Sequence, residues 1–501
     1  MTAVQQVAAA DGIRLATEVH LPDGPPGPHP AVLLRTPYDR RAHRAEARGW
    51  AARGYAAVLQ DVRGRYASEG RWHPYRHETE DGAGTLRWLR AQRWCDGRVV
   101  AAGASYAAHC ALALALTARA ATRPDAVIAA VPALGTAETA REPGGPERLL
   151  ARAGWWAAHG DRPDSDPAAL DRALATDPRL LEHLPVAALP DRLGRPLPSW
   201  PQLWRHPRPG PLLRHAGRAT VPLLAVGGSR DPFAGDTHRL WASWGAPARL
   251  LLGPWGHGLT AQPGPEARPG HRIDLGGLYA RWASAALAGR LTEGAAGAVA
   301  LGGSELWCRA TAPAGERRWH LGAPDGLRPL RGTAFTADPA RPVRSDTLDI
   351  PRSGTPDRCL LLTLPLDRPL DLLGPAELAL TASADTAHAD WAVRLVALAP
   401  DGTADPLAFG AVRRADPPGA TAAFTVPLGR LARRLPAGTR LRVEVAGHHF
   451  PAHVRQPHTG ADPVTATRLL ASRRTVRPTG STLRLAVGRA TPIDPAEETC
   501  R

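Results

Sequence analysis

The sequence predicts an α/β fold with a mostly parallel sheet, an inserted helical region and a C-terminal all-β domain. Three observations predict it. Continuous apolar runs alternate with helical segments in the first 134 residues, strand signals are absent from 135 to 213, and short β-rich runs recur after residue 293. At 501 residues the chain is also too long for one hydrophobic core, which favours two or three domains.

Continuous apolar runs in the first 290 residues are expected to be buried strands. Segments of helical spacing separate them, and this alternation indicates a parallel sheet with helices on both faces. The alternation stops near Gly135 and resumes at Val221. The expected strands are 31–38, 55–64, 97–105, 126–133, 221–231 and 248–258, and the expected helices are 43–54, 80–92, 106–121 and 278–289.

The two remaining regions have different patterns. Residues 135–213 hold helical fragments and proline-rich turns with four tryptophans, so a helical cap is expected to interrupt one α/β domain. Beyond 293 the chain turns to short alternating runs between turn signals, which is typical of a β-sandwich or jelly roll. These runs are 376–384, 390–402, 421–429, 439–447 and 481–488.

Charge and cysteine usage limit the classes of partner. The net charge is +15 and the chain contains no lysine, but its arginine-rich stretches are interrupted by apolar residues and lack interleaved aromatics. No nucleic-acid partner is therefore expected. The N-terminus lacks the pattern of a secretory signal, and no apolar run reaches the ~18 residues of a membrane span. We expect a cytoplasmic protein with five reduced cysteines and no membrane partner. The sequence leaves open whether the protein forms a homodimer.

A lone serine lies where a predicted strand meets a predicted helix. The run "GRVVAAGAS" ends on Ser105, the segment 106–121 follows, and Gly103 and Ala104 precede the serine. A G-x-S turn in this place is the sequence form of a nucleophile elbow, which projects the serine hydroxyl above the sheet. In an alanine-rich chain it also fits an ordinary strand–helix loop, so the motif alone does not decide.

An acid and a histidine follow Ser105 in the order that a hydrolase of this kind requires. Asp231 ends one predicted strand and His257 follows the next, so all three side chains are expected at one edge of the sheet. Taken alone, Asp231 fits a helix N-cap and His257 a surface histidine. Taken together, they predict that His257 removes the proton of Ser105 while Asp231 holds the imidazole.

Two donors are expected to stabilise the oxyanion. One is the backbone amide of Tyr106, the residue after the serine, and the other is the phenol of Tyr38 in "RTPYDRR", which follows a predicted strand. A structural role beside a proline turn is the alternative for Tyr38. Serine acyl transfer needs no metal or organic cofactor, and none is predicted.

Seven motifs follow one another along the chain: "DGIRLATEVHLP", "RTPYDRR", "QDVRGRYASEG", "RWCDGRV", "GASYAAH", "GGSRDPFAG" and "LLGPWGHG". In this order they resemble the motifs of the cocaine esterase-like (NonD) hydrolases in the X-prolyl dipeptidyl peptidase superfamily. The resemblance continues in "LPAGTRLRVEVAGHHFPAHVRQPHTG" and covers nearly the whole chain. It implies an α/β-hydrolase domain in 1–134 and 214–292, a helical cap in 135–213, and a jelly-roll domain in 293–501.

The same resemblance implies roles for individual residues. It makes Ser105 the nucleophile, Asp231 and His257 its partners, and Tyr38 and the Tyr106 amide the oxyanion hole. In "DVRGRYASEG", Asp61 and Arg63 are expected to form a structural ion pair rather than to act in catalysis.

The chain departs from the family pattern at the elbow and beside the acid. Ala108 stands where the family usually has glycine, which questions the geometry of the elbow. Phe233 and Ala234 stand where α-amino ester hydrolases place carboxylates for an ammonium group. Phe233 suits an apolar or aromatic acyl group, and Trp155 and Trp156 are a candidate opposite wall, with packing inside the cap as their alternative.

These residues together predict a serine esterase that acts on a small-molecule ester with an apolar or aromatic acyl group. Alternatives with the same triad are an amidase or acylase, an X-prolyl-type peptidase, and an acyltransferase in a biosynthetic pathway. A degenerate binding protein that uses its jelly roll is the alternative without catalysis. Matched ester and amide substrates distinguish an esterase from an amidase, and added nucleophiles reveal acyl transfer. Glycan binding without turnover would indicate the binding protein.

Overall fold

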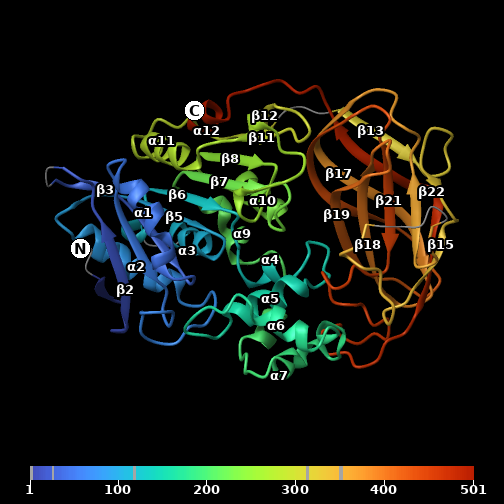
Figure 1. Cartoon of the computed structure of the whole chain (residues 1–501), viewed down its shortest axis with the longest axis horizontal. Helices are drawn as coiled ribbons and strands as arrows, with labels where there is room; N and C mark the ends of the chain where they lie inside the picture. Colours follow the sequence, from blue (N-terminus) through green and yellow to red (C-terminus); the bar gives the residue numbers. More distant parts are fainter. Residues whose placement is uncertain (1–3, 25–26, 117–119, 312–314, 349–353) are drawn as a thin grey trace.

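The computed structural model describes residues 4–24, 27–116, 120–311, 315–348 and 354–501. Figure 1 shows an α/β domain, a small helical region below its centre and an all-β domain beside both. The C-terminus returns across the molecule to the α/β domain, which it reaches next to α11 (Leu275–Leu287).

The α/β domain is built on a ten-stranded, mostly parallel sheet, as predicted. Its order is β1-β2-β4-β3-β5-β6-β7-β8-β11-β12, and all pairs from β4 to β11 are parallel. The strands are β1 (Val4–Ala8), β2 (Arg14–His20), β3 (His29–Thr36), β4 (Ala56–Asp61), β5 (Cys95–Ala104), β6 (Ala126–Ala130), β7 (Leu223–Gly228), β8 (Ala248–Gly253), β11 (Ala295–Ala300) and β12 (Trp307–Arg309).

Helices cover both faces of this sheet. One face packs against α1 (Arg44–Ala51) and α11 through Trp50 and Trp282. The other packs against α2 (Glu78–Arg90), α3 (Tyr106–Ala115) and α10 (Ala234–Ser243). Strands buried on both faces carry the continuous apolar runs that the sequence displays. The expected helix 106–121 runs past α3 into residues 117–119, which lie outside the described residues.

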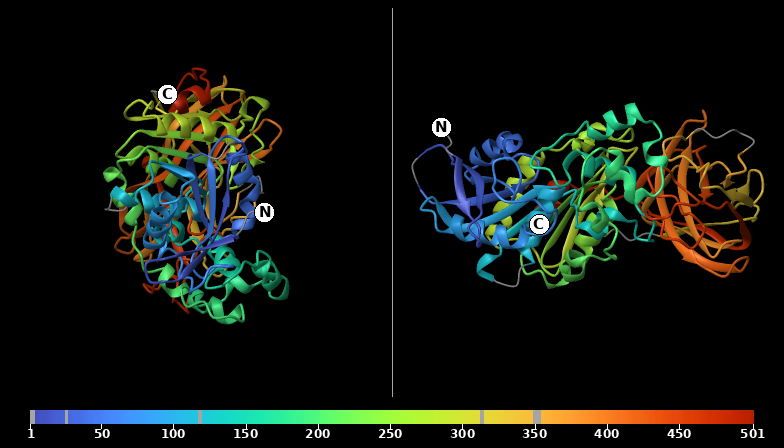
Figure 2. Two further views of the ribbon diagram at one scale, coloured as in Figure 1. Left: turned by 90° about the vertical axis from the view of Figure 1, so that its left-hand side faces the viewer. Right: turned by 90° about the horizontal axis from the view of Figure 1, so that it is seen from below.

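The helical region lies between β6 and β7, where the described chain forms no strand. Its core gathers Trp156, Trp200 and Trp204 and includes Phe450 of the C-terminal domain, so the two regions share one hydrophobic cluster. The second view of Figure 2 shows this region alongside both domains. The helices are α4 (Thr136–Ala140), α5 (Leu150–His159), α6 (Ala169–Thr176), α7 (Leu189–Arg192), α8 (Trp200–Leu203) and α9 (Pro211–His215).

The C-terminal domain is a sandwich of two antiparallel sheets. One has the order β13-β22-β17-β20 with β15 on β22, and the other is β14-β16-β21-β18-β19. Inward side chains of both sheets form one core around Trp391 and Trp319. The strands are β13 (Gly315–His320), β14 (Arg328–Pro329), β15 (Ala334–Ala337), β16 (Arg358–Leu362), β17 (Leu370–Ala384), β18 (His388–Leu398), β19 (Ala404–Ala415), β20 (Thr421–Leu435), β21 (Arg440–Ala446) and β22 (Ser472–Val487).

The expected start of the all-β domain at residue 293 is wrong. Strands β11 and β12 hydrogen-bond into the α/β sheet, because β11 pairs in parallel with β8. The last helix, α12 (Pro495–Cys500), also packs on the α/β domain, where Cys500 joins the cluster around Trp282. The sandwich therefore begins with β13, and its chain ends before α12.

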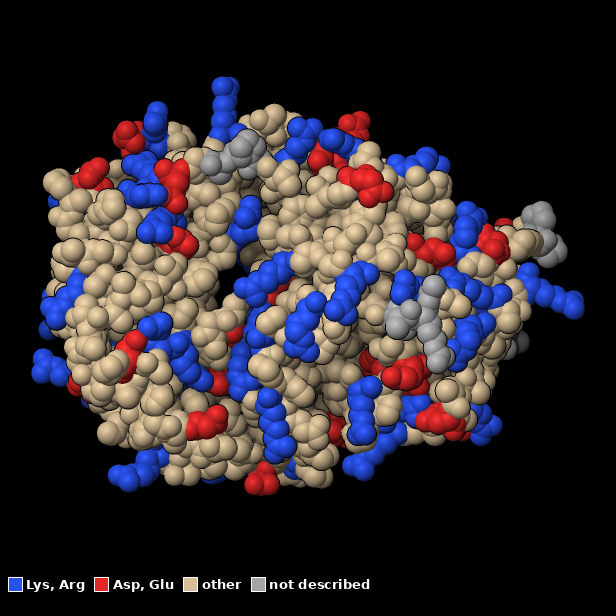
Figure 3. Space-filling model, turned by 180° about the vertical axis from the view of Figure 1, so that it is seen from behind, with Lys and Arg blue, Asp and Glu red and all other residues tan. Residues whose placement is uncertain are grey.

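Arginines are spread over the surface rather than confined to one element. On the face shown in Figure 3 the basic side chains are distributed widely, with acidic side chains among them. Among the described residues, no helix is both long and apolar enough to cross a bilayer.

Candidate active site

Ser105 occupies a strained turn between β5 and α3. Its backbone has φ 56° and ψ −119°, a region that residues other than glycine rarely adopt and that costs about 1–3 kcal/mol. The turn is fixed because the Ser105 amide donates to the Ala130 carbonyl at 2.9 Å and its own carbonyl accepts from Ala133 at 3.1 Å. Strain of this kind clusters at functional sites, and the serine side chain is left half-exposed.

Two small residues let α3 pack directly behind this turn. A Cβ on Gly103 would lie 2.5 Å from the backbone carbon of Ala107, so only glycine fits there. Ala108, which replaces the usual glycine, is fully buried among Ala101, Ala111 and other residues of the sheet–helix core. The core accommodates its methyl group, and the strained Ser105 backbone is kept.

Asp231 and His257 meet at the carboxyl ends of two neighbouring strands. Asp231 follows β7, and His257 follows β8 in the turn between β9 (Trp255–Gly256) and β10 (Leu259–Pro263). The His257 Nδ1 lies 2.8 Å from an oxygen of Asp231. The Asp231 side chain is fully buried whereas that of His257 is 42% exposed. Because Nδ1 faces the carboxylate, Nε2 is the nitrogen left to exchange a proton.

His257 holds the Asp231 side chain, and ion pairs of the preceding residue hold its loop. The other oxygen of Asp231 is buried and finds no hydrogen-bond partner in the described chain, so His257 is its one side-chain partner there. The preceding residue, Arg230, bonds Glu266 at 2.7 Å and Asp405 of the sandwich at 2.7 Å. Through this ion pair the C-terminal domain stabilises the loop that carries Asp231.

The Tyr38 phenol lies beside Ser105 and the Tyr106 amide. Burial raises the pKa of Tyr38, while hydrogen bonds from Trp155, the Ser105 side chain and the Tyr106 backbone lower it in part. Trp155 donates its indole N–H to the Tyr38 oxygen at 3.1 Å. The phenol therefore stays protonated at neutral pH, and its own hydrogen is available to donate to a developing oxyanion.

The structure does not join all of the predicted groups directly. No hydrogen bond links the Ser105 hydroxyl to His257 within the described residues, although Ser105 contacts Tyr38 and His257 contacts Asp231. Catalytic hydrogen bonds are often long in unliganded enzymes and shorten when substrate binds.

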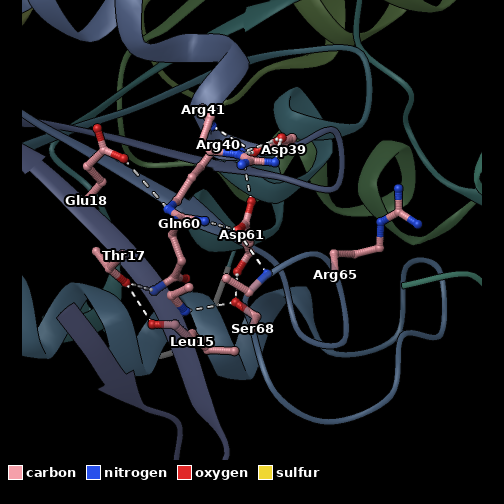
Figure 4. Close-up of polar contacts among 12 residues, drawn as sticks. Leu15, Thr17, Glu18, Asp39, Arg40, Arg41, Gln60, Asp61, Arg65 and Ser68 are labelled. Atoms are coloured by element: carbon pink, nitrogen blue, oxygen red, sulfur yellow. Dashed lines mark hydrogen bonds and ion pairs between the residues drawn. The ribbon is translucent and has the colours of Figure 1, made fainter. Parts of the chain in front are cut away.

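Charged residues buried beneath the Tyr38 loop hold it in place. Figure 4 shows Asp61 facing Arg40, with Arg65 pointing away from that group. Asp61 accepts the Arg40 backbone N–H at 2.7 Å, and Thr36 accepts the Tyr38 backbone N–H at 3.1 Å. From the other side, Arg65 donates to the Pro37 carbonyl at 2.8 Å.

The expected ion pair between Asp61 and Arg63 is not formed. Asp61 pairs with Arg40, whereas Arg63 pairs with Asp11 and Asp81, each at 2.6 Å. The two residues therefore act on different partners. Arg65, two positions further on, also reaches the Tyr38 loop, and the sequence analysis missed it.

The side chain of Tyr106 is a buried anchor for the elbow. It donates to Glu78 at 2.8 Å and accepts the Tyr75 backbone N–H at 2.6 Å. Glu78 in turn lies 3.4 Å from Arg35 on β3. Tyr106, whose amide is the expected oxyanion donor, is thus fixed by hydrogen bonds to Glu78 and Tyr75. The sequence motif around Ser105 does not reveal these partners.

The two cap tryptophans have different surroundings. Trp155 stacks parallel to Tyr106 with ring centroids 6.0 Å apart, in addition to its bond to Tyr38. Trp156 is instead 1% exposed in the cap core, where it donates to Ser199, so it does not form the expected wall. Phe233 meets His257 edge-on with centroids 5.5 Å apart. No group of three possible metal ligands occurs among the described residues.

Two family models match the chain. One, described as X-Pro dipeptidyl-peptidase (S15 family), matches residues 11–259, and the other, described as the X-Pro dipeptidyl-peptidase C-terminal non-catalytic domain, matches residues 303–486. Cocaine esterase from Rhodococcus sp. (strain MB1 Bresler) is 32% identical, over 50% of this chain and 48% of that protein. The match thus spans about half the length of this curated relative.

Several solved structures resemble nearly the whole chain. An α-amino acid ester hydrolase has a TM-score of 0.77 at 19% identity, over 97% of this chain and 96% of that one. An aminopeptidase from a marine sediment Thaumarchaeota archaeon has a TM-score of 0.75 at 20% identity, over 98% and 96%. At such identities the likeness establishes the fold: an α/β-hydrolase domain joined to an antiparallel β domain.

Proposed function

Because the chain belongs to the X-Pro dipeptidyl-peptidase (S15) family of serine hydrolases, we propose that it hydrolyses carboxylic esters through an acyl-enzyme on Ser105. The observation that carries this proposal is the Asp231–His257 pair at the strand ends, in the sheet whose elbow holds Ser105. A serine hydroxyl becomes an effective nucleophile only when a neighbouring base accepts its proton.

The reaction follows from this arrangement. The Ser105 oxygen attacks the ester carbonyl while His257 takes the hydroxyl proton on Nε2, and Asp231 stabilises the resulting imidazolium. The Tyr38 phenol and the Tyr106 amide donate to the carbonyl oxygen as it becomes negative. His257 then protonates the departing alkoxide, which leaves an acyl-enzyme. Water attacks that ester with His257 as base, releases the acid and restores Ser105.

The acyl group is proposed to be apolar or aromatic. Two aromatic side chains support this choice: Phe233 is buried at the edge of His257, and Trp155 stacks on Tyr106 next to the serine. Both contact the residues that would surround the reacting carbon. Aryl and aliphatic 4-nitrophenyl esters of rising acyl length measure the preference, and a best substrate of acetyl size would contradict it.

Labelling by a fluorophosphonate probe tests the nucleophile. The wild type is expected to gain one probe mass on the peptide that carries Ser105, and the Ser105→Ala variant is expected to gain none. Ser243→Ala, a replacement on the surface helix α10, is the matched control and should label as the wild type does. Equal labelling of the Ser105→Ala variant would remove the assignment. Matched 4-nitrophenyl ester and 4-nitroanilide substrates then separate an esterase from an amidase.

The dependence of kcat/KM on pH has a predicted shape. His257 must be neutral to accept a proton, so the rate is expected to fall in acid. Because burial raises the pKa of Tyr38 above its usual value, the phenol stays protonated and the rate should hold to at least about pH 9. A rate that does not fall in acid would contradict the role of His257. An alkaline loss below pH 9 that disappears in Tyr38→Phe would contradict that of Tyr38.

A further inference from the structure

Arg152 is a buried cation without a counter-charge. It lies on α5 with 6% of its surface exposed, and its side chain forms neither a hydrogen bond nor an ion pair with any described residue. Its Nε is buried and unpartnered. A buried charge is costly unless it is paired, so an isolated guanidinium calls for an anion that arrives from outside the chain.

The neighbouring charges are already matched with one another. Arg148, four positions earlier and just before α5, binds Glu142 through two nitrogens at 2.9 and 3.1 Å, and His453 lies 3.0 Å from the same carboxylate. Asp236, which lies within electrostatic reach of Arg148, forms an ion pair with Arg208. No acid is therefore left over among these groups to neutralise Arg152.

Arg152 also lies next to the candidate active site. It precedes Trp155 by three positions on α5, so both side chains share one face of that helix, and Trp155 bonds the Tyr38 oxygen. The Arg152 charge lowers the pKa of Tyr38 and Tyr75 against the larger opposing effect of burial, which places the guanidinium within electrostatic reach of both phenols. Burial lowers the pKa of Arg152 itself to about 10, so it is still charged at neutral pH.

We propose that Arg152 binds a carboxylate of the substrate, so that the esters on which this protein acts are anionic. A planar guanidinium matches a carboxylate through two parallel hydrogen bonds, which makes arginine well suited to this recognition. This inference rests on the proposed esterase activity and specifies its substrate class. It fits the loop after Asp231, where the uncharged Phe233 and Ala234 offer nothing to a substrate cation.

The first test compares charged and neutral substrates of the wild type. On the acyl side, the 4-nitrophenyl monoesters of terephthalic and isophthalic acid are compared with 4-nitrophenyl benzoate. On the alcohol side, 4-acetoxybenzoate is compared with phenyl acetate. We expect kcat/KM for the charged member to exceed that for the neutral member by about tenfold or more in one of the two arms. The favoured arm identifies the side of the scissile bond that bears the carboxylate.

The second test removes the charge. The ratio of charged to neutral kcat/KM is expected to fall at least tenfold in Arg152→Met and to recover in part in Arg152→Lys, which keeps the charge but loses the paired geometry. Arg172→Met is the matched control, because Arg172 is an exposed arginine of the same helical region with 62% of its side chain accessible. That variant should keep the wild-type ratio.

The outcomes separate this inference from the proposed function. Neutral esters that are hydrolysed, with no preference for the charged member in either arm, would overturn the role of Arg152 and leave the esterase intact. An equal loss on charged and neutral substrates in Arg152→Met would also overturn it, because it indicates a structural role. If Ser105 does not label and no ester is hydrolysed, the proposed function fails. The wild-type comparison does not depend on whether a variant folds.

Discussion

Replacement of Ser105 or His257 by alanine is expected to lower kcat for an aryl ester by about a millionfold, and the double replacement should lower it no further. Without the base the serine is a weak nucleophile, and without the serine the base has nothing to activate, so the two act as one unit. Steady-state and single-turnover rates with a 4-nitrophenyl ester measure the loss. Asp231→Asn should cost about 10⁴-fold, because the amide favours the wrong imidazole tautomer.

The control is an exposed histidine of the helical region, His206. His206→Ala should retain the wild-type rate and the wild-type far-UV circular dichroism. Additive losses in the double variant would contradict the account, since independent contributions mean that Ser105 and His257 do not share a proton. A loss below about tenfold in His257→Ala would contradict it more simply, because another group would then be the base.

Tyr38→Phe is expected to lower kcat by about 10²- to 10³-fold with little change in KM. The phenol donates to an oxygen that becomes fully negative only in the transition state, so its removal costs more there than in the bound ground state. The fluorophosphonate should still label Ser105, but more slowly. The measurement is kcat and KM for one ester, together with the second-order rate of labelling.

Two variants separate this effect from loss of packing. Tyr55→Phe removes a phenol that is buried at a distance, beside Trp50, and should leave kcat unchanged. Trp155→Phe keeps a ring but removes the N–H that orients Tyr38, so an intermediate loss of kcat is expected. A rise in KM at constant kcat in Tyr38→Phe would contradict the assignment, because it indicates uniform binding rather than stabilisation of the transition state.

The parallel strands from β3 to β8 were predictable because burial on both faces requires continuous apolar sequence. The edges were not. Strand β1 reads "VQQVA" with one buried residue, and β12 has three residues, so neither has a pattern that can be distinguished from a loop. The boundary at residue 293 failed for the same reason: β11 and β12 join the α/β sheet through backbone pairing, which their side chains do not encode.

The candidate site likewise contains residues that the sequence could predict and residues that it could not. Ser105, Asp231 and His257 stand next to strand ends, and the order of strands is enough to bring them to one edge. The residues that support them are not marked in this way. Arg65 holds the Tyr38 loop through the Pro37 carbonyl, and Glu78 holds Tyr106 from another helix. Arg152 is one arginine among many in the sequence, and only its burial without a partner distinguishes it.

A crystal structure of the adduct with an aryl phosphonate tests the central claim most directly. The account predicts phosphorus bonded to the Ser105 oxygen, its phosphoryl oxygen about 3 Å from both the Tyr38 hydroxyl and the Tyr106 amide, and His257 Nε2 within hydrogen-bond distance of Ser105. A phosphonate on any other residue, or a phosphoryl oxygen turned away from both donors, would contradict it.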